Sequence, residues 1–153
     1  MSRRDQIKMT EEEVDAFLHE QKTMSIATIG ADGRPHLVAM WFTFVDGKIA
    51  FWTFAKSQKV LNLRRDPRIT CLVEDGSEYN NLRGVELVAR ARITDDPDEV
   101  LRFGELEFER YQGVNVTDAV RPAVANMANK RVVVYVEVDK VVSWDHRKLG
   151  GGY

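Results

Sequence analysis

The residue types best suited to chemistry lie in one basic segment just after the end of a predicted strand. Between positions 56 and 68 the chain has five Lys or Arg residues and one acid, a local charge of +4 in a chain whose formal net charge is −2. A strand pattern ends at Phe54 and a helix pattern begins at Ser57. The free N–H groups of that helix therefore point toward the same place as Lys56 and Lys59. This strand-to-helix corner predicts a phosphate site without a glycine-rich loop.

A solvated helix face is the alternative interpretation of the same segment, because Lys and Arg on a short helix usually face water. Other kinds of site have less support in the sequence. The three histidines, His19, His36 and His146, are far apart, and the single cysteine, Cys71, lies in an apolar run. No metal site and no catalytic side chain are expected, and the glycine pattern of a dinucleotide-binding fold is absent from the sequence.

Strands and short helices must position this corner. A capping box at Thr10 and Glu13 predicts a helix over 10–21. The alternation of apolar and polar residues predicts six strands, at 23–29, 36–45, 48–54, 68–74, 82–94 and 131–144. A two-residue turn with positive φ is expected at Asp46-Gly47, so the first three strands are expected to pair consecutively. Further helices are expected from 57 to 66, from the cap at 95–98 to 111, and over 118–129.

The length, charge and composition of the chain limit the classes of protein to which it can belong. A chain of 153 residues with 44% apolar content is expected to form one domain, 1–153, with a C-terminal tail at 144–153 whose glycines have little intrinsic structure. Surface charge of mixed sign gives no general attraction to nucleic acid or to a membrane. The charged N-terminus and the lack of an 18-residue apolar run in the sequence predict a cytoplasmic protein.

Several segments, taken in order, resemble the pyridoxamine-5′-phosphate-oxidase-like flavin and deazaflavin oxidoreductases. They are the turn Thr28-Ile29-Gly30-Ala31-Asp32-Gly33-Arg34-Pro35-His36, then Lys56-Ser57-Gln58-Lys59, Asn62-Leu63-Arg64-Arg65-Asp66-Pro67-Arg68 and Val141-Val142-Ser143-Trp144. The chain length and the Asn62–Arg68 segment look most like the actinobacterial branch that binds coenzyme F420, a deazaflavin with a phospholactyl-oligoglutamate tail. The resemblance implies an FMN-binding split β-barrel, mainly β with short α-helices, of about six antiparallel strands in a Greek-key-like order.

The resemblance also implies which residues hold the cofactor. Lys56, Ser57 and Lys59 match the family's phosphate-binding stretch, and Thr53 matches the strand-end position that helps to hold it. The strand that runs along the flavin or deazaflavin ring matches Val38, Ala39, Met40 and Trp41, with His36 near the ring.

Three further implications concern the rest of the cofactor and a partner. Arg64 and Arg65 would meet the acidic tail of F420. Family members are homodimers with cofactor sites at the interface, so Trp144 and His146 of a second subunit would cover the other face of the ring. The C-terminal sequence His146-Arg147-Lys148-Leu149 departs from true pyridoxamine-phosphate oxidases, which argues against vitamin B6 oxidation.

Three functions remain open at this stage. The first is an F420-dependent oxidoreductase that transfers hydride to a small conjugated organic electron acceptor, such as an unsaturated ketone, a quinone or a tetrapyrrole. The second is an FMN-dependent oxidase or reductase on the same scaffold, since a terminal phosphate suits the same corner. The third is a non-catalytic protein that binds a flavin, F420 or haem. In the first two the cofactor performs the redox chemistry, so no catalytic triad is required.

Overall fold

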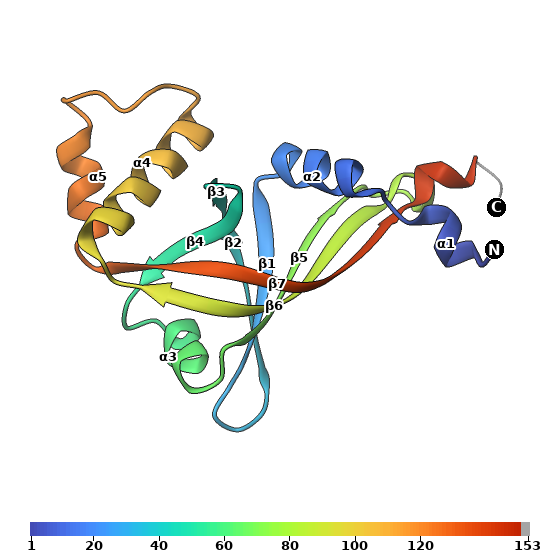
Figure 1. Cartoon of the computed structure of the whole chain (residues 1–153), viewed down its shortest axis with the longest axis horizontal. Helices are drawn as coiled ribbons and strands as arrows, with labels where there is room; N and C mark the ends of the chain where they lie inside the picture. The colour runs from blue at the N-terminus through green and yellow to red at the C-terminus, as the bar shows by residue number, and fades with distance from the viewer. Residues whose placement is uncertain (151–153) are drawn as a thin grey trace.

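One antiparallel sheet of seven strands curls into a half-open barrel (Figure 1), which confirms the predicted split β-barrel. The structure is a computed structural model, and it describes residues 1–150. Along the sheet the strands lie in the order β2-β1-β5-β6-β7-β4-β3. Their bounds are β1 Thr23–Ile29, β2 Pro35–Trp41, β3 Thr43–Val45, β4 Lys48–Phe54, β5 Arg68–Asp75, β6 Arg83–Thr94 and β7 Arg131–Asp145.

Helices cover parts of the sheet, and the four predicted ones are confirmed. These are α2 Glu11–Glu20, α3 Gln58–Arg65, α4 Pro97–Gln112 and α5 Arg121–Ala128. A short helix α1, Arg3–Ile7, was not expected; Ser2 and Asp5 form its capping box. Single 3-10 turns lie at η1 Tyr79–Asn81 and η2 His146–Leu149. Within residues 1–150, no helix is both long enough and apolar enough to span a membrane.

The C-terminal end is more ordered than the sequence indicated. Trp144 and Asp145 complete β7, and η2 follows directly. The strand predicted to end at Trp144 extends one residue further, because the β6–β7 pairing reaches Asp145, and the first part of the predicted tail at 144–153 is therefore regular structure. The glycines and tyrosine at 151–153 lie outside the described residues.

The predicted strand 36–45 is broken at Phe42, and this changes the topology. β2 pairs with β1, whereas β3 pairs with β4, so the two halves lie at opposite edges of the sheet. The break has a specific cause: the Phe42 N–H donates to the Tyr111 hydroxyl at 3.0 Å, and the Phe42 carbonyl accepts from Arg110 at 2.8 Å. These α4 side chains replace the strand hydrogen bonds at Phe42. Both predicted hairpin pairings form, β1 with β2 and β3 with β4, and the prediction of one continuous strand over 36–45 is wrong at Phe42.

Arg110 connects three parts of the chain at this crossover. Besides the Phe42 carbonyl, its guanidinium donates to the carbonyls of Leu18 at 3.2 Å and Gln21 at 2.5 Å. The guanidinium carbon also lies 4.6 Å from the centre of the Phe42 ring. Arg110 therefore ties α4 to the end of α2 and to the β2–β3 crossover.

The core has two parts because both faces of β4 are covered. Inside the barrel, fully buried side chains such as Met24, Ile26 and Phe51 pack together. On the other face of the sheet, α4 and α5 cover Trp52 and Val133, which face each other across β4 and β7. Alternation along β4 thus directs Thr53 to the barrel interior and its two neighbours to the helix side.

Candidate functional site

The predicted corner between β4 and α3 forms as expected, with Ser57 as the N-cap residue of α3. The Lys59 ammonium donates a 3.0 Å hydrogen bond to the Thr53 hydroxyl, and the Thr53 and Ser57 hydroxyl oxygens are 3.4 Å apart. The Ser57 side chain makes no capping hydrogen bond. Thr53, Ser57 and Lys59 therefore converge on one point beside the N-terminus of α3.

The corner is electrostatically suited to an anion. Lys59 is half-buried, and this burial lowers the pKa of its ammonium from the usual value of 10.5. The N–H groups of the first turn of α3 add a partial positive charge, since the first intrahelical bond is that from Leu61 to the Ser57 carbonyl. A phosphate placed here would accept hydrogen bonds from neutral and charged donors, and would favour the protonated form of Lys59.

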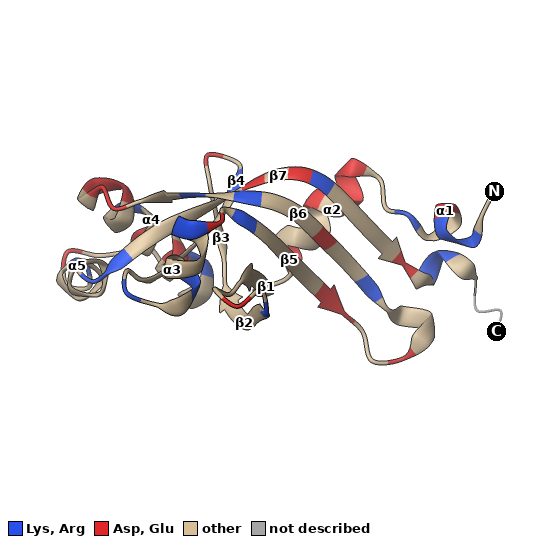
Figure 2. Cartoon of the chain, turned by 90° about the horizontal axis from the view of Figure 1, so that it is seen from below, with Lys and Arg blue, Asp and Glu red and all other residues tan. Residues whose placement is uncertain are grey.

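Lys56 lies on the other side of the corner, where it lines a groove of about 770 Å³. The groove runs between the corner, the start of α4 and the segment that joins α5 to β7. Its charged side chains are four cations and one acid: Lys56, Arg64, Lys130, Arg131 and Asp95. Figure 2 shows Lys and Arg on α3 and on the neighbouring segment between α5 and β7. Two of the five cations of the 56–68 segment, Lys56 and Arg64, thus line this groove together with Lys130 and Arg131, and we call it the basic groove.

Lys130 and Arg131 were not identified in the sequence. They reach the basic groove because β4 pairs with β7, which places Arg131 opposite Phe54. The Arg131 guanidinium carbon lies 4.4 Å from the centre of the Phe54 ring. A Lys-Arg pair at the start of a strand carries no local sign of this pairing, so the sequence alone had no signal for it.

The other cations of the segment make different contacts. Arg65 donates to the Ile29 carbonyl at 2.6 Å and so holds α3 against the end of β1. Arg68 forms a two-pronged ion pair with Asp66, with nitrogen–oxygen distances of 3.0 and 2.7 Å. The hydrogen bonds from Arg68 lower the pKa of the Asp66 carboxyl to about 2. Of the two arginines predicted to meet the cofactor tail, Arg64 lines the basic groove. Arg65 is not among the residues that line the groove, and its guanidinium donates to the Ile29 carbonyl.

His36 and Asn62 lie at the same end of the barrel. The fully buried Asn62 amide donates a 3.0 Å hydrogen bond to Thr28 on β1, and Thr28 faces His36 across the β1–β2 pair. The His36 Nδ1 atom is buried and has no hydrogen-bond partner among the described residues. An unsatisfied buried nitrogen is uncommon, and here it lies on β2 opposite Thr28, which Asn62 of α3 contacts.

The predicted ring-binding strand, β2, lies at an edge of the sheet. Val38 and Met40 face the barrel core, whereas Ala39 and Trp41 face outward. Alternate N–H and C=O groups of an edge strand point away from its single neighbour, so they are available to the polar edge of a planar heterocycle. The position and free edge of β2 suit the ring-binding role that the family resemblance implies for residues 38–41.

Trp144 lies at the end of β7 and His146 begins η2, and this C-terminal part of the chain is far from α3 (Figure 1). The Trp144 ring packs on Gly84, where a Cβ atom would collide with it. His146 Nδ1 lies 2.8 Å from the Tyr79 carbonyl oxygen. One chain therefore does not bring these two residues to its own corner, and they can only reach such a corner on a second copy.

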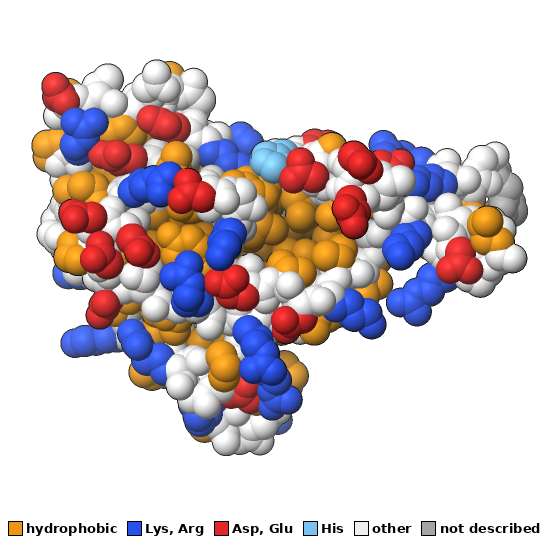
Figure 3. Space-filling view, viewed as in Figure 1, with side chains coloured by type: hydrophobic (Ala, Val, Ile, Leu, Met, Phe, Trp, Pro, Cys, Tyr) orange, Lys and Arg blue, Asp and Glu red, His pale blue; other side chains and the backbone are white. Residues whose placement is uncertain are grey.

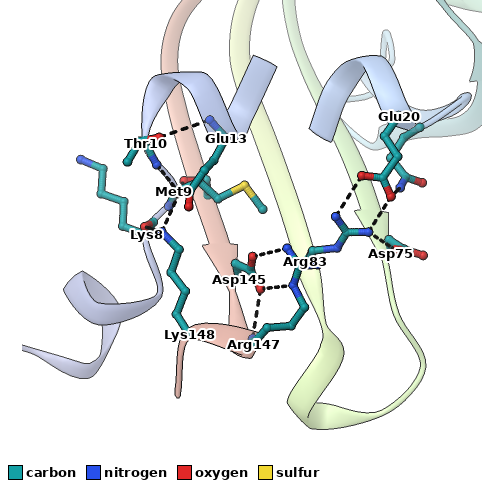
Figure 4. A network of polar contacts seen from close by, with 12 residues as sticks. Lys8, Met9, Thr10, Glu13, Glu20, Asp75, Arg83, Asp145, Arg147 and Lys148 are labelled. Carbon is teal, nitrogen blue, oxygen red and sulfur yellow. Dashed lines mark hydrogen bonds and ion pairs between the residues drawn. The ribbon is translucent and has the colours of Figure 1, made fainter. Parts of the chain in front are cut away.

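Ion pairs fix this C-terminal end to the rest of the chain (Figure 4). Arg83 donates to Glu20 at 2.8 Å and to Asp75 at 2.6 Å, and these bonds lower the pKa of both carboxyls. Lys148 pairs with Glu13 at 2.6 Å. The network joins α2, the adjacent ends of β5 and β6, and η2. It therefore fixes the position of the segment that contains Trp144 and His146.

The chain is similar in sequence and in fold to several known proteins. The model of the family described as pyridoxamine 5'-phosphate oxidase matches residues 10–145. The F420H(2)-dependent biliverdin reductase of Mycobacterium tuberculosis (strain CDC 1551 / Oshkosh) is 33% identical over 131 residues, 83% of this chain and 82% of that protein. The crystal structure of the conserved hypothetical protein Rv2991 from Mycobacterium tuberculosis has a TM-score of 0.93 and 46% identity, with 100% of this chain and 95% of that chain covered. A solved F420 reductase has a TM-score of 0.62 and 25% identity, with 83% and 94% covered.

Proposed function

The chain belongs to the pyridoxamine 5'-phosphate oxidase family, and we propose that it is an oxidoreductase that binds coenzyme F420 and reduces a small conjugated organic compound. The similarity to an F420H(2)-dependent reductase supports a flavin or deazaflavin cofactor. The choice of F420 and the class of acceptor are the parts that we propose.

The basic groove is the observation that carries the choice of F420. The convergence of Thr53, Ser57 and Lys59 suits the phosphate that FMN and F420 share. FMN ends at that phosphate, whereas F420 continues into a chain of glutamates. The basic groove starts at Lys56, on the other side of that corner, and would present the cations of Arg64, Lys130 and Arg131 to such a tail.

The protein's own residues then have binding and orienting roles. The corner would hold the phosphate, the edge of β2 would hydrogen-bond the polar rim of the ring, and the buried His36 nitrogen would gain a partner. When bound, the cofactor supplies the hydride that the reaction needs. No acid–base triad of the protein is required for that transfer, and the protein contributes position and electrostatics.

We also propose that the functional unit is a homodimer. On the outward face of β2, Leu37 is 71% exposed and Trp41 is 52% exposed. Figure 3 shows hydrophobic side chains exposed across the middle of the face viewed there as well. Exposed apolar surface of this kind marks an interface. A second copy would bring its Trp144 and His146 over the ring. Light scattering at micromolar concentration is expected to give twice the chain mass of 17.5 kDa, and a monomeric mass would overturn this part.

The F420 proposal is tested by titrating the purified protein with F420 and with FMN while cofactor fluorescence is followed. Lys59→Met is expected to weaken both cofactors by more than about tenfold, since a charge-assisted hydrogen bond contributes about 1.5–3 kcal/mol. The double variant Arg64→Ala/Lys130→Ala is expected to weaken F420 by a larger factor than FMN, because only F420 has the anionic tail. Lys48→Ala, at the other end of β4, is the matched control and is expected to bind both cofactors as wild type does.

Each alternative predicts a different result. Equal effects of the double variant on both cofactors, with tighter binding of FMN, would favour an FMN-dependent enzyme. Tight F420 binding without oxidation of the reduced cofactor across a panel of enones, quinones and tetrapyrroles would favour a non-catalytic binding protein. If Lys59→Met bound both cofactors with unchanged affinity, the β4–α3 corner would not be the phosphate-binding site.

A further inference from the structure

A second, smaller cavity lies on the other side of the sheet, between β4, the end of β2 and the helices α4 and α5. Its volume is about 250 Å³. The walls are largely aromatic and apolar, with one carboxyl group, that of Glu107; the residues used below are Trp41, Trp52, Tyr111 and Met127. We call it the α4–α5 cavity. Of these residues only Trp41 has a place in the proposed cofactor role, and Glu107 has none.

Aromatic planes define the shape of the α4–α5 cavity. Trp41 stacks on Tyr111 with ring centres 4.1 Å apart and an angle of 11° between the planes. Gly104 on α4 allows Trp52 to enter from the sheet, because a Cβ atom at position 104 would lie 2.7 Å from the Trp52 ring. A cavity of about 150 Å³ bounded by apolar side chains is enough to bind benzene, so this one has room for a substituted ring. Its shape suits a small planar compound.

Glu107 gives the α4–α5 cavity its polar feature. The side chain is 8% exposed, although it is ionisable. Among the described residues its hydrogen-bond partner is the Trp52 indole, which leaves capacity on the carboxyl for a ligand. Burial raises the pKa of Glu107 to about 7, while Trp52 and the positive charge of Arg131 oppose the increase. Near neutral pH a large fraction of Glu107 therefore carries a proton that it can donate.

The charges around Glu107 favour a neutral ligand over a cation. From β7, Arg131 lies with its guanidinium carbon 4.9 Å from the centre of the Trp52 ring, so one aromatic face already holds a cation. From α4 itself the other titratable group is Tyr111, whose pKa is raised mainly by burial. α5 and β2 contribute the uncharged Val124, Met127 and Trp41. An anion would meet the ionised form of Glu107 and would be repelled at higher pH.

We propose that the α4–α5 cavity binds a small, neutral, planar carbonyl compound whose oxygen accepts a hydrogen bond from the Glu107 carboxyl. This inference goes beyond the proposed function and does not rest on it, because no cofactor takes part in the binding. Two of the three tryptophans of the chain, Trp41 and Trp52, line the cavity and report on its occupancy.

The test uses the purified chain without cofactor and follows quenching of tryptophan fluorescence. The probes are acetophenone, its hydrocarbon isostere α-methylstyrene, and benzylamine as a cation. Acetophenone is expected to bind at least fivefold more tightly at about pH 5.5 than at about pH 8.5, since these values lie on either side of the Glu107 pKa of about 7. The isostere, which has no hydrogen-bond acceptor, is expected to bind equally at both pH values.

Variants and spectroscopy separate the hydrogen bond from general effects of pH. Glu107→Gln keeps a donor amide, so it is expected to bind acetophenone with no dependence on pH; Glu107→Leu is expected to lose the preference for acetophenone over the isostere. If either variant fails to fold, the infrared carbonyl stretch of acetophenone bound to the wild-type chain gives the same information. A shift to lower frequency is expected at the lower pH and not at the higher one.

Three results would overturn the proposal. They are the absence of saturable quenching by acetophenone up to its solubility limit, acetophenone binding that is independent of pH in the wild-type chain, and benzylamine binding that strengthens as pH rises. The last result would show a cation site in place of a carbonyl site. Since F420 and FMN are left out, none of these outcomes bears on the cofactor titrations.

Discussion

Replacing Arg110 by methionine tests whether one α4 side chain holds the crossover between the two edges of the sheet. Methionine keeps an aliphatic contact with Phe42 and removes all the donors. The two shortest bonds that are lost are those to the carbonyls of Gln21 at 2.5 Å and Phe42 at 2.8 Å. The Phe42 carbonyl keeps the Tyr111 hydroxyl as a donor at 2.8 Å, so the Gln21 carbonyl is the acceptor that loses its partner. A buried acceptor left unsatisfied costs about 1–3 kcal/mol, which for a chain of this size corresponds to a decrease in Tm of about 3–9 °C.

Differential scanning calorimetry of the wild-type and variant proteins measures this change. The matched control is Arg102→Met on the same helix, which removes an exposed ion pair with Asp46 and is expected to shift Tm by less than about 2 °C. If Arg110→Met melted within the same small interval as the control, the crossover would not depend on Arg110. The reasoning about the break at Phe42 would then be refuted.

Two other predictions follow from buried groups. Cys71 is fully buried and burial raises the pKa of its thiol to about 12, so an aromatic disulfide reagent at mildly alkaline pH is expected to react only after denaturation. Rapid labelling of the native protein, detected by mass spectrometry, would contradict this. Gly84→Ala adds a methyl group against the Trp144 ring and is expected to destabilise the protein by about 1–3 kcal/mol in urea unfolding, with a changed Trp144 environment. Wild-type stability of that variant would show that the Trp144 ring moves aside at no cost.

Most of the local structure could be predicted from neighbouring residues. The Thr10 capping box does begin α2, and Asp46 and Gly47 adopt φ values of 51° and 80°, as a tight hairpin turn requires. These features depend on a few consecutive residues. The break at Phe42 does not, because the groups that bind its N–H and carbonyl come from positions 110 and 111. The continuous apolar run from 37 to 42 gave no indication of it.

The same difference between contacts of neighbouring residues and contacts of distant ones applies to the two candidate sites. Thr53, Ser57 and Lys59 could be predicted together because they lie on one strand end and the next helical turn. Arg131 joins the basic groove only through the β4–β7 pairing. Glu107 belongs to the run Glu105-Leu106-Glu107, which is typical of a solvent-exposed helix face, and it is buried because Gly104 lets Trp52 pack against α4. Contacts between distant segments decide which charged side chains come together.

The crossover at Phe42 also constrains the order in which the chain folds. The Arg110 guanidinium bonds carbonyls that lie 68 and 92 positions earlier in the chain, at Phe42 and Leu18. Contacts between residues so distant form slowly, because a long loop must close before they are made. During synthesis β2 and β3 emerge well before α4, so the Phe42 N–H and carbonyl lack their Tyr111 and Arg110 partners until α4 arrives. Closure of the barrel is therefore expected as a late event, and a nascent chain that stops before α4 would expose two open sheet edges to aggregation.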